Sequence, residues 1–155
     1  MAGWTQVVAF ALDELRFAVT LSQVERIVRA VEITPLPDAP KTVHGIINVE
    51  GRIVPVVNTR KRLGISEREI ELDDLFVIVN GDGRSLALVA DEVLPVLEIP
   101  DKLLVPSDDV LPGKRFVQGI ADTDNGMIMI LDIDKALTYE EHGDLQRIVG
   151  ALSED

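Results

Sequence analysis

The sequence predicts an all-β fold of two small barrels that lie side by side with a groove between them, followed by a C-terminal helix. Apolar residues come mostly in short runs bounded by turn residues, which is typical of β-strands. The chain also contains an internal repeat of about 70 residues, and each copy has room for about five short strands. Because closing a small sheet into a barrel removes its exposed edges, each copy is expected to form one barrel.

The length, the charge and the lack of cysteine restrict the class of protein. The chain has 155 residues, the size of one domain. Its formal charge of −12 argues against nucleic acid and against an anionic membrane surface, because both bind clustered lysine and arginine. Without cysteine there are no disulfides, thiolate zinc sites or cysteine nucleophiles. The N-terminus lacks the basic region of a signal peptide and no apolar run approaches about 18 residues, so we expect a cytoplasmic protein without a membrane span.

Two hairpins are the clearest elements of the first half. The first turns at Asp13-Glu14, and the second turns at Glu50-Gly51, where glycine supplies a positive φ. A loop with two prolines lies between them, because proline removes the donors that a sheet needs. In order, the predicted elements are strands at 6–12 and 15–19, a helical turn at 21–27, a strand at 28–33, the proline loop at 36–40, the hairpin at 45–58, a short basic segment at 60–63 and a polar loop at 66–74.

The second half repeats this arrangement and adds a helix. Its two hairpins turn at residues 80–84 and 122–126, which are rich in Asp, Asn and Gly. Past Tyr139, four apolar residues spaced by 3, 1 and 3 positions predict an amphipathic helix at about 141–152. The predicted strands are at 75–79, 86–90, 93–99, 116–121 and 127–131, with a loop at 106–113.

The repeat pairs residues of the two halves at nearly constant shifts. A shift of 69 residues pairs Val24 with Val93, and after the prolines a shift of 74 pairs the sequence V-H-G-I with V-Q-G-I. Two residues paired in this way are called repeat mates below. The prediction is one domain, residues 1–155, with repeat halves at about 7–64 and 75–138.

The sequence offers little for catalysis or metal binding. The two histidines, His44 and His142, lie far apart, and no serine lies in a nucleophile elbow. Residues 122–126 resemble the start of a calcium loop, but the glycine comes one position early and no closing glutamate follows. The adjacent acids at 73–74 and 108–109 are typical of solvated loops. We therefore expect no enzymatic activity, no catalytic residue, no metal ligand and no cofactor.

Four stretches, in order along the chain, resemble the CheW family. The most specific is GIINVEGRIVPVVNTRKRLGI at 45–65, which is similar to the family's pattern of Gly, two aliphatics, Asn and an aliphatic, then Arg-Gly and an aliphatic-Pro-aliphatic strand. The other three are VAFALDELRFAVTLSQVERI, LALVADEVLPVLEI and FVQGIADTDNGMIMILDIDKAL. Together the matches run from about Val7 to Leu137, and the repeat is what a double barrel would show.

The resemblance implies two intertwined five-stranded barrels of the SH3/OB type around a hydrophobic core. It implies an adaptor without catalysis that binds the regulatory domain of a CheA-type histidine kinase and the cytoplasmic hairpin tip of a chemoreceptor. Such an adaptor is recruited from the cytoplasm to membrane-associated receptor arrays. The alternative is a repurposed CheW-like regulatory module of a two-component system that serves pili, development or second-messenger control.

Carried over position by position, the resemblance also implies a receptor groove. Its residues would be Val24, Gly45, Val93, Val96 and Gly119. An amphipathic receptor helix would lay its apolar face along the valines, and a missing side chain at a glycine lets another backbone come close. The alternative is that the valines are ordinary core residues and the glycines serve local backbone geometry.

The sequence departs from the family pattern at four positions, which are candidates for partner specificity: Arg26, Glu50, Asn58 and Ala87. Glu50 stands where the family usually has Arg, and Arg26 stands near a usual Glu, so both reverse a charge. Asn58 replaces a frequent Asp, and Ala87 replaces a frequent Gly. Because an exposed charge mainly sets partner choice and association rate, the two reversals predict a specialised chemosensory system whose partners have correspondingly altered charges. The alternative is drift at exposed positions.

Overall fold

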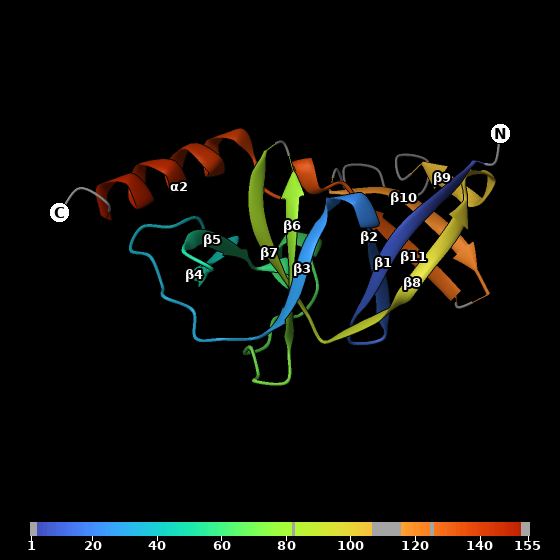
Figure 1. Ribbon diagram of the computed structural model, residues 1–155, viewed down its shortest axis with the longest axis horizontal. Helices are drawn as coiled ribbons and strands as arrows, with labels where there is room; N and C mark the ends of the chain where they lie inside the picture. The colour runs from blue at the N-terminus through green and yellow to red at the C-terminus, as the bar shows by residue number, and fades with distance from the viewer. Residues whose placement is uncertain (1–2, 82, 107–115, 125, 153–155) are drawn as a thin grey trace.

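The computed structural model describes residues 3–81, 83–106, 116–124 and 126–152, and shows two β-sheets side by side (Figure 1). One sheet, called barrel A, contains β1 (Trp4–Leu12), β2 (Leu15–Thr20), β8 (Glu92–Pro100), β9 (Leu104–Pro106), β10 (Val117–Thr123) and β11 (Gly126–Leu131). The other, called barrel B, contains β3 (Val24–Arg29), β4 (Val43–Val49), β5 (Arg52–Val57), β6 (Leu75–Gly81) and β7 (Arg84–Ala90). The strand orders are β8-β1-β2-β11-β10-β9 and β3-β6-β7-β5-β4.

Short helical segments connect the strands. The two α-helices are α1 (Thr59–Leu63) and α2 (Tyr139–Leu152), and the 3-10 segments are η1 (Leu21–Gln23), η2 (Asp101–Leu103) and η4 (Ile133–Lys135). The chain passes from barrel A to barrel B at η1, and it returns at Asp91, a single residue between β7 and β8. Among the described segments, none of the helices is long and apolar enough to cross a membrane.

Each barrel takes strands from both halves of the chain, so the expectation that each repeat copy forms one barrel by itself is wrong. β1 and β2 of the first half join β8 to β11 in barrel A, whereas β6 and β7 of the second half join β3 to β5 in barrel B. Equivalent parallel pairs occur in both: Ala18 lies opposite Ile130 in barrel A, and their repeat mates Ala87 and Val56 lie opposite each other in barrel B. The prediction of an all-β fold of two intertwined barrels is confirmed.

The central strands face two different cores because side chains alternate along a strand. In β6, Phe76 and Ile78 belong to the core inside barrel B, whereas Val77 and Val79 belong to a core between the barrels. β1 alternates in the same way between the core inside barrel A and the core between the barrels. We call the latter the shared core, and its largest fully buried side chains are Phe10, Phe17, Leu12, Leu86, Leu88, Leu131 and Ile133.

The predicted helical turn at 21–27 and strand at 28–33 have the wrong boundaries. The 3-10 segment ends at Gln23, and β3 runs from Val24 to Arg29. β3 pairs with β6, with Val24 opposite Val79, and a β-bulge lies between Val24 and Arg26. The bulge interrupts the alternation that marks a strand in the sequence, so the long-range pairing with β6 decides the structure.

The C-terminal helix α2 starts with a capping box. The Thr138 amide donates to Glu141 Oε1 at 2.7 Å, and the Glu141 amide donates to Thr138 Oγ1 at 3.1 Å. Leu145 is buried, and Ile148 and Val149 pack partly buried against the shared core. The helix α2 lies beside barrel B (Figure 1). Most of the loop predicted at 106–113, with the acids at 108–109, lies outside the described residues.

Candidate functional site

The three candidate valines lie beside the shared core, on the edge strands β3 and β8. Val24 lies opposite Val79, Val93 lies opposite Phe10, and Val96 lies opposite Val8, and all three of these partners belong to the shared core. Val24 and Val93 are themselves partly buried against that core. Directly opposite residues project from the same face of a sheet, so the valines mark the margins of the contact between the barrels.

Ile27 belongs with these valines, although sequence reasoning did not select it. It is 40% exposed, and its repeat mate Val96 is 51% exposed. Ile27 lies opposite Val77, another residue of the shared core. The signal was available in the sequence, because a shift of 69 residues pairs Ile27 with Val96 just as it pairs Val24 with Val93. We call Val24 and Ile27 on β3, with Val93 and Val96 on β8, the seam residues.

The two candidate glycines lie elsewhere, on β4 and β10, beside the register shifts of those strands. A Cβ on Gly45 would lie 2.2 Å from the Thr34 carbonyl oxygen, and its φ is 153°, so the backbone itself requires glycine. A Cβ on Gly119 would lie 3.3 Å from the Val105 carbonyl oxygen. Gly119 lines a hollow of about 240 Å³ beside β9 with Leu104, Val105, Pro106, Gln118 and Ile130. This close approach and the positive φ support a structural role for Gly45, which is the alternative that the sequence left open.

The two charge reversals form an ion pair with each other. Arg26 Nη1 lies 2.8 Å from Glu50 Oε1, and Arg26 Nη2 donates to Glu50 Oε2 at 2.9 Å. Both side chains are exposed, and the hydrogen bond from Arg26 lowers the pKa of Glu50. One contact therefore accounts for both departures from the family pattern: reversing one charge of the pair favours reversing the other.

A second charged network lies beside this pair. Glu25 accepts from Arg52 at 2.7 Å and from Ser85 at 2.5 Å, and it also accepts from Asn80. These hydrogen bonds, that from Arg52 first, lower the pKa of Glu25 to about 2. The surface around β3 therefore carries four charged groups held by ion pairs: the carboxylates of Glu25 and Glu50 and the guanidinium groups of Arg26 and Arg52. A partner that contacts this surface would meet both signs of charge.

The remaining two specificity candidates have internal roles. Asn58 is buried and caps α1, because its Oδ1 accepts from the Lys61 amide. Its Nδ2 also donates to Glu67 at 2.7 Å. Its repeat mate Asp132 caps η4 in the same way. Ala87 is fully buried in the core of barrel B. Neither side chain presents a surface to a partner, so Arg26 and Glu50 are the exposed residues among the four specificity candidates.

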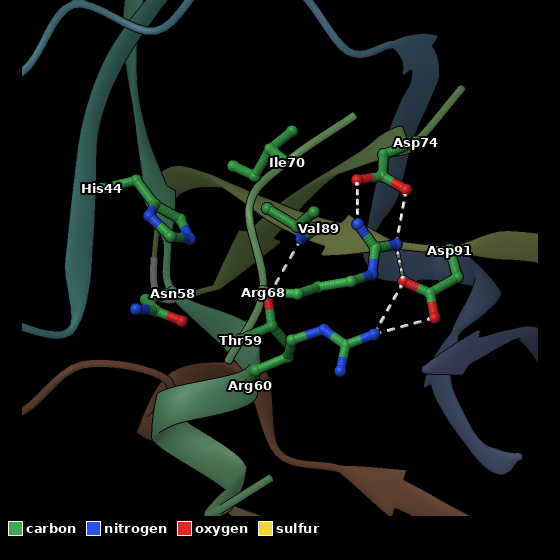
Figure 2. Close-up of a pocket in the computed structure, with 9 residues that line it drawn as sticks. All are labelled: His44, Asn58, Thr59, Arg60, Arg68, Ile70, Asp74, Val89 and Asp91. Carbon is green, nitrogen blue, oxygen red and sulfur yellow. Dashed lines mark hydrogen bonds and ion pairs between the residues drawn. The ribbon is translucent and has the colours of Figure 1, made fainter. Parts of the chain in front are cut away.

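Five charged residues meet where the two barrels and the β7–β8 crossing come together. Arg60 Nη2 donates to Asp91 at 2.8 and 3.0 Å, and Arg68 Nη2 donates to the same carboxylate at 2.5 Å (Figure 2). Arg68 also binds Asp74 through two hydrogen bonds, and Arg60 binds Asp13 at 2.8 and 3.1 Å. We call these five residues the ion cluster. It was not predicted, because its members are spread from residue 13 to residue 91 with no common spacing.

Asp74 corrects an expectation from the sequence. The adjacent acids at 73–74 were expected to be solvated, but Asp74 is 3% exposed. Burial, the largest influence, acts to raise its pKa, yet the hydrogen bonds from Arg68 and from the Glu71 amide leave the pKa below its usual range. A buried carboxylate with this many donors is a structural group held in its charged form.

The ion cluster has no room for a substrate. The cavity that it lines, with the half-buried His44 on its wall, measures about 10 Å³, which is at most the space of one water molecule (Figure 2). Among the described residues, every buried polar side-chain atom has a hydrogen-bond partner. Such a cluster orients neighbouring segments, whereas the exposed seam residues and the Arg26–Glu50 pair suit contact with another protein.

Comparison with known proteins points to one family. The family model of the CheW-like domain matches residues 6–141. The chemotaxis protein CheW of Thermotoga maritima is 34% identical over 132 residues, which are 85% of this chain and 87% of that protein. The CheW of Rhizobium meliloti is 27% identical over 141 residues, 90% and 91% of the two chains. The crystal structure of the scaffolding protein TtCheW from Thermoanaerobacter tengcongensis is similar with a TM-score of 0.81 at 32% identity, over 91% of this chain and 96% of that chain.

Proposed function

Because the chain belongs to the CheW family, we propose that it couples a chemoreceptor to a CheA-type histidine kinase by surface contacts alone. The match to the CheW-like domain over residues 6–141 carries this proposal. The relatives are chemotaxis proteins, and the similar solved structure is a scaffolding protein. The chain is accordingly a coupling protein of chemotaxis signalling, and the adaptor acts without a catalytic step of its own.

The proposed partners are the regulatory domain of the kinase and the cytoplasmic hairpin tip of the receptor. Exposed apolar side chains at the seam, Ile27 and Val96, support a helical receptor segment as one partner, because an amphipathic helix buries an apolar face against such residues. Binding the receptor tip would bring the protein to membrane-associated receptor arrays. The remaining groove candidates Val24, Val93 and Gly119 are proposed to support this surface, whereas Gly45 is proposed to serve the local backbone geometry of β4.

Replacing Val96 by aspartate tests the receptor surface. Val96 is 51% exposed, so Val96→Asp is expected to leave the unfolding midpoint nearly unchanged. It places a charge in an apolar contact, and the affinity for a soluble receptor fragment that carries the hairpin tip should fall about tenfold or more, as measured by isothermal titration calorimetry.

The matched control is Met127→Asp, which adds the same charge at a residue of barrel A that is 58% exposed and lies outside the seam residues. Its receptor affinity should equal that of wild type. Equal receptor affinity of wild type and Val96→Asp would remove the seam from the receptor surface. If no kinase regulatory domain and no receptor fragment from the same genome bound the wild-type protein, the coupling function itself would be rejected.

Reversing the Arg26–Glu50 pair tests partner specificity. Arg26→Glu alone and Glu50→Arg alone each place two like charges together, whereas the double variant restores an ion pair of opposite polarity. We expect the double variant to fold like wild type but to associate more slowly with the cognate kinase domain, because charge orientation steers the encounter. Stopped-flow association at low and high salt measures this difference, which should vanish at high salt. Equal association rates at low salt would limit the pair to an internal role.

A further inference from the structure

The ion cluster holds the place where the chain returns from barrel B to barrel A. Asp91 is the single residue between β7 and β8, and its repeat mate, Ser22, lies in η1, where the chain makes the opposite crossing. The Asp91 amide donates to the Ala11 carbonyl at 2.9 Å. Its carboxylate accepts from Arg60 and Arg68 of barrel B and from the Asp13 amide of barrel A, the last at 2.7 Å. The crossing is therefore tied to both barrels at once.

Arg60 joins the two barrels directly. It begins in α1, which follows the last strand of the β4–β5 hairpin of barrel B, and its side chain is only 9% exposed. From there it reaches Asp13, in the turn between β1 and β2 of barrel A, through two hydrogen bonds. It also donates to the Ser66 carbonyl at 2.9 Å, which fixes the guanidinium from a third side. A planar guanidinium held by three partners permits one orientation of the groups around it.

The shared core constrains the two barrels in a less directional way than the ion cluster. Apolar contact between the barrels is strong, but it does not depend on the angle of any one pair of groups. Hydrogen bonds between Arg and carboxylate depend on both distance and angle. The ion cluster therefore selects one relative orientation among those that the shared core allows.

The other crossing does not repeat the ion pair between Asp91 and Arg60. The repeat mates of Asp91 and Arg60 are Ser22 and Asp134, so a serine replaces the central carboxylate and an acid replaces the guanidinium. The two crossings also lead to equivalent parts of the seam. β8 begins directly after Asp91 and carries Val93 and Val96, whereas β3 begins directly after η1 and carries Val24 and Ile27. The Arg60–Asp91 ion pair thus distinguishes one crossing of this pseudo-symmetric molecule from the other.

We propose that Arg60, Asp13 and Asp91 form a clamp between the barrels that sets the orientation of β8, and with it the seam residues, relative to barrel B. These three are positioning residues: they act through the strand that they hold. The clamp itself rests on the geometry alone, whereas its consequence for receptor binding rests on the proposed coupling function.

The test variant is Asp13→Gly, which removes the acid that barrel A contributes to Arg60. Asp13 has a φ of 55°, a conformation that glycine adopts more readily, so the variant is expected to fold. The control is Asp38→Gly, at a surface turn of barrel B where φ is 62°. It makes the same substitution at the same kind of backbone position, away from the cluster. Asp13→Asn keeps one accepting oxygen for Arg60 and should restore part of the wild-type behaviour.

Two measurements on the full chain test whether the clamp holds the two barrels in one orientation. Residual dipolar couplings should give one common alignment frame for both barrels in wild type and in Asp38→Gly, and two separate frames in Asp13→Gly. Hydrogen exchange of the Asp91 amide should become about fivefold faster in Asp13→Gly. A common frame and wild-type exchange in Asp13→Gly would overturn the clamp.

Receptor binding tests whether the clamp positions the seam residues. If the clamp positions the seam, Asp13→Gly should weaken receptor-fragment affinity about fivefold while Asp38→Gly does not. Wild-type affinity in Asp13→Gly, together with separated alignment frames, would overturn the positioning role. A wild-type protein that binds no receptor fragment would reject the proposed function, and the two structural measurements would still decide the clamp.

Discussion

Replacing Gly45 by alanine is expected to lower the free energy of unfolding by about 2–5 kcal/mol. Its added Cβ would lie 2.2 Å from the Thr34 oxygen and 2.7 Å from Ile33 Cγ2, and its φ of 153° is strained for any residue with a side chain. Thr34 and Ile46 form a backbone bridge at this point, with both amide-to-carbonyl hydrogen bonds at 2.9 Å. The clash therefore falls on backbone atoms, which cannot rotate away as a side chain would.

The repeat mate supplies the control. In Gly119→Ala the added Cβ would meet the Val105 oxygen at 3.3 Å, and Gly119 has no positive φ of the kind that excludes side chains. Val105 lies in the three-residue edge strand β9, which can move by a few tenths of an ångström, so the expected loss is about 1 kcal/mol or less. Urea unfolding followed by circular dichroism measures both variants. A Gly45→Ala protein of wild-type stability that failed to bind the receptor fragment would reverse the structural interpretation and return Gly45 to the receptor surface.

The pair of glycines shows what the repeat could and could not predict. The shift of 74 residues correctly predicts that Gly45 and Gly119 are equivalent in position, since Gly45 lies beside a register shift in β4 and Gly119 lies beside one in β10. It could not predict that Thr34 approaches only one of them so closely, because that contact depends on how the preceding loop returns to the sheet. Equivalent sequence positions thus have unequal steric surroundings.

The start of one strand, β3, could not be predicted from the local sequence, because it depends on pairing with a distant strand. The hairpins at Asp13-Glu14 and Glu50-Gly51 could be located from the sequence, because turn residues act locally. The start of β3 could not, because the bulge after Val24 removes the alternation and β6, its partner, lies about 50 residues away in sequence. The local pattern predicts a helical turn there, but hydrogen bonding to β6 makes these residues a strand.

Charged contacts were the least predictable part of the site. The reversals at Arg26 and Glu50 were visible separately, but only the fold shows that 24 residues of separation become one 2.8 Å contact. Asp13 and Asp91 are 78 residues apart and still share a hydrogen bond. Electrostatic contacts of this kind need three-dimensional positions, whereas short apolar runs are visible in the sequence alone, so most strands were predicted and the ion cluster was not.

The intertwined topology predicts that the two barrels unfold together. Phe10 is fully buried in the shared core and stacks on Phe17, with ring centroids 5.9 Å apart, so Phe10→Ala should cost about 3–5 kcal/mol. Phe76 is fully buried inside barrel B and belongs to a different core, and Phe76→Ala should cost about as much. A loss of this size is a large share of the 5–15 kcal/mol typical of a domain, roughly a third of it.

The decisive comparison uses Trp4, the only tryptophan, which lies in β1 of barrel A opposite Pro100. Because β6, which carries Phe76, is paired with β7 and β3 while the shared core joins it to β1, a cavity in barrel B should lower the unfolding midpoint that Trp4 reports in barrel A. In Phe76→Ala, urea unfolding followed by Trp4 fluorescence and by circular dichroism should therefore give one shifted, coincident transition. Phe10→Ala should do the same, since its side chain lies in the shared core. A Trp4 transition that stayed at the wild-type midpoint in Phe76→Ala would mean that the barrels unfold separately, and that exchanging strands between the halves does not make them one cooperative unit.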